Sequence, residues 1–122
     1  MKILVVDDHY GTLNAIRVYG YRVLTAHNAH EALTHLQEEK QNDKCVDVLL
    51  TDLSMPGING LELVGTAREM HPDLYVIIMT AYGDDPHVVR RMKNVKRFWL
   101  LGKPFRPEAL QKIIEEIFGE LN

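Results

Sequence analysis

Apolar residues along the chain are grouped into short continuous runs and longer segments with a helical period. Five short runs, rich in β-branched and aromatic residues, cover 3–6, 22–26, 46–51, 75–80 and 98–101. Their residues are mostly apolar in succession rather than in alternation, so the runs predict strands that are covered on both faces, as in a parallel sheet. The run over 22–26 is the weakest of the five.

Three other segments have the period of an amphipathic helix. Their apolar stripes are Ala29, Ala32, Leu33 and Leu36; Leu61, Val64, Ala67 and Met70; and Leu110, Ile113, Ile114, Ile117 and Leu121. The third stripe is the clearest amphipathic pattern in the chain. Proline is typical of the first turn of a helix, so we expect helices to begin near Pro86 and Pro107.

The alternation of these strands and helices predicts an α/β fold. We expect a doubly wound, five-stranded parallel sheet with helices on both faces. The chain has 122 residues, of which 46% are apolar, enough for one domain with its own core. No repeat, linker or low-complexity segment interrupts it, so we interpret residues 1–122 as a single domain.

Composition narrows the classes of partner. The formal net charge is −3, which gives no electrostatic reason to expect direct binding of nucleic acid or an anionic membrane. Cys45 is the single cysteine, so an internal disulfide is impossible and a reducing compartment fits. No apolar run approaches the roughly 18 residues of a membrane span, and the N-terminal run is too short for a signal peptide. We therefore expect a cytoplasmic protein.

Candidate chemistry follows the ends of four predicted strands. Asp7 and Asp8 follow the first strand, Asp52 the third, Thr80 the fourth and Lys103 the fifth. Open parallel sheets bind ligands beyond the carboxyl ends of their strands, so these side chains are expected to converge. Three neighbouring carboxylates repel one another and need positive charge. A hard cation such as Mg²⁺, together with a lysine ammonium, would supply it.

Four stretches, in this order, resemble the receiver domains of two-component response regulators. They are Val5-Val6-Asp7-Asp8, residues 49–63 with Thr51-Asp52 and Met55-Pro56-Gly57, residues 77–83, and Gly102-Lys103-Pro104-Phe105. The spacings also agree with that family: 52 − 8 = 44 residues from Asp8 to Asp52, and 80 − 52 = 28 residues from Asp52 to Thr80. The resemblance covers essentially the whole chain and implies a flavodoxin-like strand order, 2-1-3-4-5.

The resemblance implies a phosphoacceptor site. Asp52 would become an aspartyl phosphate, with a sensor histidine kinase or a phosphotransfer protein as the donor. Asp8 and Asp52, with the backbone carbonyl of Ser54, would bind Mg²⁺ directly, and Asp7 would act through water. The domain would act as a signalling switch and not as an enzyme with an external substrate.

The resemblance also implies how the signal would be passed on. Lys103 would pair with the phosphoryl oxygens, and Thr80 would bond to the phosphoryl group and draw its loop inward. A downstream protein target, or an effector domain missing from this chain, would read the change. The Lys103-Pro104 peptide is expected to be cis.

Two features depart from the family pattern. The position three residues before Lys103, usually aromatic, is Leu100, and the interval from Thr80, 103 − 80 = 23 residues, is one longer than common. Either Trp99 takes the aromatic role through a shifted strand, or that coupling is absent and the aromatic side chain only packs. The first helix, within residues 9–19, is also short for the family.

Two other functions compete with this interpretation. A metal-dependent phosphohydrolase with an aspartate nucleophile, as in the haloacid-dehalogenase group, would place two acids two residues apart after the first strand, whereas Asp7 and Asp8 are adjacent. A degenerate receiver would act only as a binding module, but Asp8, Asp52, Thr80 and Lys103 are all present.

Overall fold

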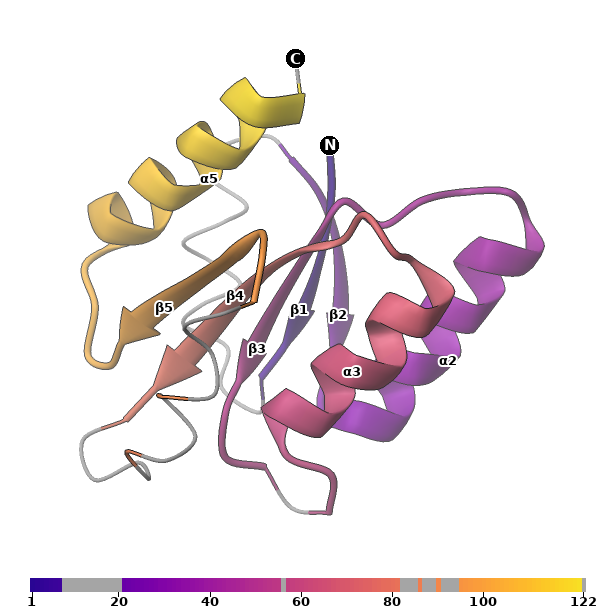
Figure 1. Ribbon diagram of the computed structural model, residues 1–122, viewed down its shortest axis with the longest axis horizontal. Coiled ribbons are helices and arrows are strands. Elements are labelled where there is room, and N and C mark those ends of the chain that lie inside the picture. The colour runs from indigo at the N-terminus through magenta and orange to yellow at the C-terminus, as the bar shows by residue number, and fades with distance from the viewer. Residues whose placement is uncertain (8–20, 56, 82–85, 87–89, 91–94, 122) are drawn as a thin grey trace.

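Five parallel strands form one sheet in the computed structural model of the chain, which describes residues 1–7, 21–55, 57–81, 86, 90 and 95–121 (Figure 1). The strands are β1 (Lys2–Val6), β2 (Arg22–Ala26), β3 (Val48–Asp52), β4 (Tyr75–Thr80) and β5 (Phe98–Gly102). Their order is β2-β1-β3-β4-β5, and every neighbouring pair is parallel. The predicted parallel sheet and strand order are confirmed.

Helices cover both faces of the sheet. Helices α2 (Ala29–Gln41) and α3 (Gly60–Met70) lie side by side on one face, and α5 (Pro107–Leu121) lies on the other (Figure 1). Strand side chains alternate between the two faces. Leu4, Leu49 and Val76 belong to the core under α2 and α3. Ile3 and Leu50 belong to the core under α5. Both faces are therefore apolar, which is why the strands have continuous apolar sequences.

The two helices on the first face begin at asparagine caps. The Oδ1 atom of Asn28 accepts a hydrogen bond of 2.9 Å from the backbone N–H of Glu31, at the start of α2. Asn59 does the same for Glu62 at the start of α3, also at 2.9 Å. An asparagine side chain in this position satisfies a backbone donor that the helix leaves unpaired. These caps fix the residue at which each helix begins.

The structure corrects three details of the predicted pattern. Strand β3 covers Val48–Asp52 rather than 46–51, so Asp52 is the last residue of the strand. Leu63 of α3 is fully buried although it lies outside the predicted stripe, because α3 packs against both the sheet and α2. Leu121 has 44% of its surface exposed, because the buried stripe of α5 ends at Ile117.

Several expectations fall outside the described residues. They include Asp8, the short helix within 9–19 and most of the segment that follows Pro86, so the helices expected there stay predictions. Among the described residues, no helix is long and apolar enough to cross a membrane.

Candidate functional site

The expected site residues that the structure describes lie at one edge of the sheet. Asp7 directly follows β1, while Asp52 and Thr80 are the last residues of β3 and β4. Lys103 follows the last residue of β5, and its backbone N–H donates to the carbonyl oxygen of Thr80 at 2.6 Å. The backbone N–H of Asp7 donates to Ala26, at the end of β2, at 3.1 Å. Backbone hydrogen bonds between neighbouring strand ends thus fix the positions of the backbone atoms that carry these side chains.

Asp7, Asp52 and Lys103 form a buried cluster of charge. The Nζ atom of Lys103 is ion-paired with Oδ1 of Asp52 and lies 3.8 Å from Oδ2 of Asp7. Asp7 and Asp52 expose only 5% and 8% of their surfaces, whereas the Lys103 side chain exposes 26%. One ammonium therefore faces two buried carboxyl groups, and it can reach solvent or a ligand.

Burial, together with the charges of this cluster, raises the proton affinity of Asp52. Burial, followed by the adjacent carboxyl group of Asp7, raises the pKa of Asp52 to about 6, although Lys103 acts in the opposite direction. Burial disfavours the charged form of a carboxyl group, and a neighbouring carboxylate disfavours it further. One ammonium does not balance two carboxyl groups, and a bound cation would supply the missing positive charge.

The donor set fits Mg²⁺. Asp7 and Asp52 offer hard oxygen ligands, and Ser54, two residues after Asp52, is exposed with its backbone carbonyl as a further candidate. Mg²⁺ in proteins commonly takes one or two carboxylates and keeps several waters. Within the described residues, no three His, Cys, Asp or Glu side chains form a complete metal site, and Asp8 lies outside them. The arrangement suits a cation that completes its shell with water and phosphoryl oxygens.

Gly60 allows the start of helix α3 to approach the end of β3 closely. Its backbone N–H donates to the carbonyl of Leu53 at 2.8 Å. A Cβ atom at position 60 would lie 2.3 Å from the backbone oxygen of Asp52, closer than real Cβ contacts come. Only glycine fits this approach of helix α3 to the end of β3. The sequence pattern alone predicts no role for Gly60; the available signal was a glycine at the first position of α3, directly after the Asn59 cap.

The aromatic residues of β5 lie away from the usual position before the lysine. Trp99 packs on the α5 side of the sheet: its ring centroid is 6.0 Å from that of Tyr75, and its Nε1 donates to Glu116 of α5 at 3.1 Å. Leu100 exposes 40% of its surface on the other side. Thr80 pairs with Gly102 in the sheet, and the Lys103-Pro104 peptide is cis, as the resemblance implied. In this structure Trp99 has a packing role.

Comparison with known proteins agrees with this geometry. The sequence model of the response regulator receiver domain matches residues 3–115. The chain belongs to this family. Receiver domains are in general signalling domains of two-component systems rather than enzymes of metabolism, and the family generally uses Mg²⁺ at its phosphorylation site.

Individual relatives support the same assignment. The chain is 30% identical to Sporulation initiation phosphotransferase F of Bacillus subtilis, over 94% of this receiver and 91% of that protein. It is 36% identical to the Transcriptional regulatory protein ZraR of Klebsiella oxytoca, over 95% of this receiver but only 26% of that protein. A receiver domain structure from Clostridium thermocellum has a TM-score of 0.80 and 29% identity, over 98% of this chain and 94% of its own.

Proposed function

We propose that this receiver accepts a phosphoryl group on Asp52, with Mg²⁺ bound beside it, from a sensor histidine kinase or a phosphotransfer protein. The observation that carries the proposal is the buried cluster in which Lys103 faces Asp52 and Asp7. The printed name of the sporulation relative, a phosphotransferase, supports the same chemistry. The phosphorylated receiver would signal to a downstream protein target or to an effector domain.

The transfer replaces one bond to phosphorus by another. A carboxylate oxygen of Asp52 attacks the phosphorus of a phosphohistidine, the P–O bond forms, and the P–N bond breaks with its electron pair left on the imidazole nitrogen. With a pKa near 6, Asp52 is mainly ionised at pH 7 and can act as the nucleophile. Mg²⁺, when bound, would supply charge to the phosphoryl oxygens.

Lys103 has the second role in this chemistry. Its ammonium is paired with Asp52 in the structure and is partly exposed, so it can move from the carboxylate to the arriving phosphoryl oxygens. A preorganised cation at the position where negative charge develops lowers the barrier without costly reorganisation. Asp7, Asp52 and the Ser54 carbonyl, with Asp8 as the resemblance implies, would hold the metal.

Thr80 would couple the phosphoryl group to the shape of the surface. Its hydroxyl lies at the end of β4, and its backbone carbonyl accepts from Lys103 at 2.6 Å. A hydrogen bond from this hydroxyl to the phosphoryl group would favour one conformer of the loop that follows β4. The proposal includes a cytoplasmic location, in line with the free cysteine, Cys45. It also includes no direct contact with nucleic acid or membrane, in line with the net charge of −3.

Intact-mass measurement after incubation with acetyl phosphate and Mg²⁺ tests the proposal. The wild-type protein should gain the mass of one phosphoryl group, and Asp52→Asn should gain none. Asp73→Asn, at the opposite edge of the sheet, is the matched control and should be phosphorylated like wild type.

Other outcomes favour the competing functions. A wild-type protein that gains no phosphoryl mass would indicate a receiver that only binds partners. Steady turnover of a small phosphate ester would instead indicate the phosphohydrolase.

A further inference from the structure

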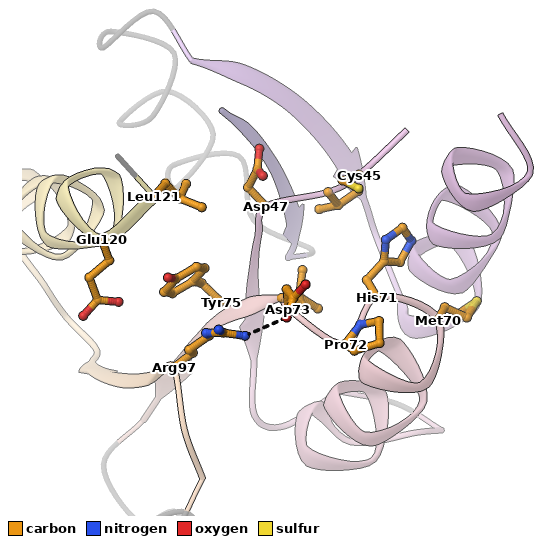
Figure 2. Close-up of a pocket in the computed structure, with 12 residues that line it drawn as sticks. Cys45, Asp47, Met70, His71, Pro72, Asp73, Tyr75, Arg97, Glu120 and Leu121 are labelled. Carbon is orange, nitrogen blue, oxygen red and sulfur yellow. Dashed lines mark hydrogen bonds and ion pairs between the residues drawn. The ribbon is translucent and has the colours of Figure 1, made fainter. Parts of the chain in front are cut away.

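A pocket of about 400 Å³ lies at the edge of the sheet opposite to Asp52. It is lined by residues at the amino ends of three strands: Asp47 just before β3, Leu74 and Tyr75 at the start of β4, and Arg97 just before β5. Strands of five or six residues place it roughly 16 Å from the acidic cluster. It is therefore separate from the proposed phosphorylation site. Figure 2 shows the residues that line it.

The inner part of this pocket is apolar. Val46, Leu74 and Tyr75 line it, and each exposes less than a tenth of its surface. Leu121, at the end of α5, adds an exposed apolar side chain at the rim. Small-molecule sites typically have volumes of about 300–1,000 Å³ and combine an apolar wall with a few polar groups. The pocket can thus hold a small ligand with an apolar body.

The ring of Tyr75 already binds a cation from this chain. The guanidinium carbon of Arg97 lies 5.4 Å from the ring centroid of Tyr75. The same guanidinium is paired with Asp73 at 3.1 Å, shown by the dashed line in Figure 2. An aromatic face attracts cations through its quadrupole. Arg97 therefore occupies this face of Tyr75 and is paired with only one of the acidic residues of the lining.

Within the part of the chain that the structure describes, two acidic side chains of the lining have no cationic partner. Asp47 accepts a hydrogen bond of 2.8 Å from the backbone N–H of Lys2, a neutral donor, while the Lys2 ammonium is paired with Glu39. Among the described residues, no ion pair involves Glu120. The lining contains three acids, Asp47, Asp73 and Glu120, and one strong base, Arg97, so its formal charge is 1 − 3 = −2.

We propose that this pocket binds a small organic cation, an amine carried on an apolar body. The apolar part would lie against Leu74 and Tyr75, and the ammonium group would lie toward the acidic rim, to which Asp47 and Glu120 contribute. Anionic ligands are disfavoured because the rim is negative. The inference does not depend on phosphorylation of Asp52.

Trp99 provides a built-in reporter for this site. It is the only tryptophan of the chain, and its ring lies 6.0 Å from that of Tyr75. A ligand against Tyr75 would change the surroundings of Trp99 and hence its fluorescence. Trp99 also donates a hydrogen bond to Glu116, so it connects Tyr75 in the pocket lining to helix α5.

The test uses three probes of nearly equal shape: 2-phenylethylamine, the neutral 2-phenylethanol and the anionic 3-phenylpropanoate. Each is titrated into the wild-type protein while Trp99 fluorescence and backbone amide shifts are recorded. The amine should saturate with a Kd of about 1 mM, as expected for a ligand of this size. Amide shifts should centre on Leu74 and Tyr75, with weaker binding of the alcohol and none of the acid.

Charge variants distinguish binding that depends on the acidic side chains from nonspecific hydrophobic binding. Asp47→Asn and Glu120→Gln should each weaken binding of the amine by about threefold, the size expected for a partly exposed charge. Glu108→Gln, at the other end of α5, should leave it unchanged. The proposal is overturned if the alcohol binds as tightly as the amine, if nothing saturates by about 20 mM, or if the charge variants bind like wild type. Because Asp52 plays no part in these titrations, their failure would not affect the proposed phosphorylation.

Discussion

Two ion pairs at opposite edges of the sheet have similar chemistry and different surroundings. Lys103 and Asp52 pair at the carboxyl edge, where their side chains expose 26% and 11% of their surfaces. Arg97 and Asp73 pair at the amino edge, where their side chains expose 44% and 95%. Exposed pairs contribute about 0–1 kcal/mol, whereas buried charges carry a desolvation cost that a single partner offsets only in part.

The two edges differ in how much their charged groups lower the stability of the fold. At the amino edge the Arg97–Asp73 pair is exposed to water, so this pairing changes stability little. At the carboxyl edge burial, and after it the second buried carboxyl group, Asp7, raise the pKa of Asp52, and the cluster is short of positive charge. Active sites commonly carry such unfavourable arrangements because function requires them. Four predictions test this contrast.

The largest effect is expected from loss of the Lys103 ammonium. Lys103→Met should slow phosphorylation by acetyl phosphate by about a hundredfold to a thousandfold, since removal of one preorganised charge-stabilising group costs about that much. Arg97→Met, at the other edge, should change the rate less than about twofold. The rate of mass gain measures both, with circular dichroism as the check on folding. Equal rates for the two variants would contradict the contrast.

The close approach that shapes the carboxyl edge should be nearly as sensitive. Gly60→Ala should lower the free energy of unfolding by about 2–3 kcal/mol, because its Cβ would collide with the backbone oxygen of Asp52. Gly65→Ala, on the same helix with open space around it, should raise it by about 0.5–1 kcal/mol. Urea unfolding measures both changes. Destabilisation of the same size in both variants would count against the collision.

Removal of the buried charge should stabilise the fold. In buffer without divalent cations, Asp52→Asn should raise the free energy of unfolding at pH 7.5 by about 1–2 kcal/mol, since an amide carries no charge to desolvate. The folded state keeps the Asp52 proton up to about pH 6, whereas the ordinary pKa of the group is 3.8. Wild-type stability that depends on this group therefore falls as pH rises from about 4 to about 6.

The measurement for this prediction is urea unfolding of wild type and Asp52→Asn across that pH window. The advantage of the variant should be small near pH 4 and grow toward pH 6.5. A difference that stays constant with pH would show that the carboxyl charge is not its cause. Millimolar Mg²⁺ should stabilise wild type more than the variant, because it binds the folded site.

The smallest effect is expected at the exposed pair. Asp73→Asn should change the free energy of unfolding by less than about 0.5 kcal/mol, because its side chain is almost fully hydrated. Addition of 0.5 M salt, at which the Debye length is only a few ångströms, should remove even that difference. Urea unfolding at low and high salt provides the measurement, and a loss above about 1 kcal/mol would show that the pair is structural.

Part of the candidate site could be predicted before the structure was known. Asp7, Asp52 and Lys103 stood at the ends of apolar runs, and parallel strands place such ends together. The role of Gly60 could not be predicted, because it depends on a backbone oxygen eight residues earlier in the chain. The side taken by Trp99 depends on the register between β4 and β5, which pairs Ile77 with Trp99. The chemical roles of all the predicted site residues, Asp7, Asp8, Asp52, Ser54, Thr80 and Lys103, stay predictions.

By itself, the sequence determined the class of fold and the position of its strands, because a strand covered on both faces must be apolar at every position, and such runs are visible in one dimension. Only the tertiary structure decided how charge is balanced at each edge, which glycine admits a backbone contact, and that a pocket opens beside Tyr75. These properties depend on distances between segments far apart in the chain, and such distances are set by packing rather than by any local pattern.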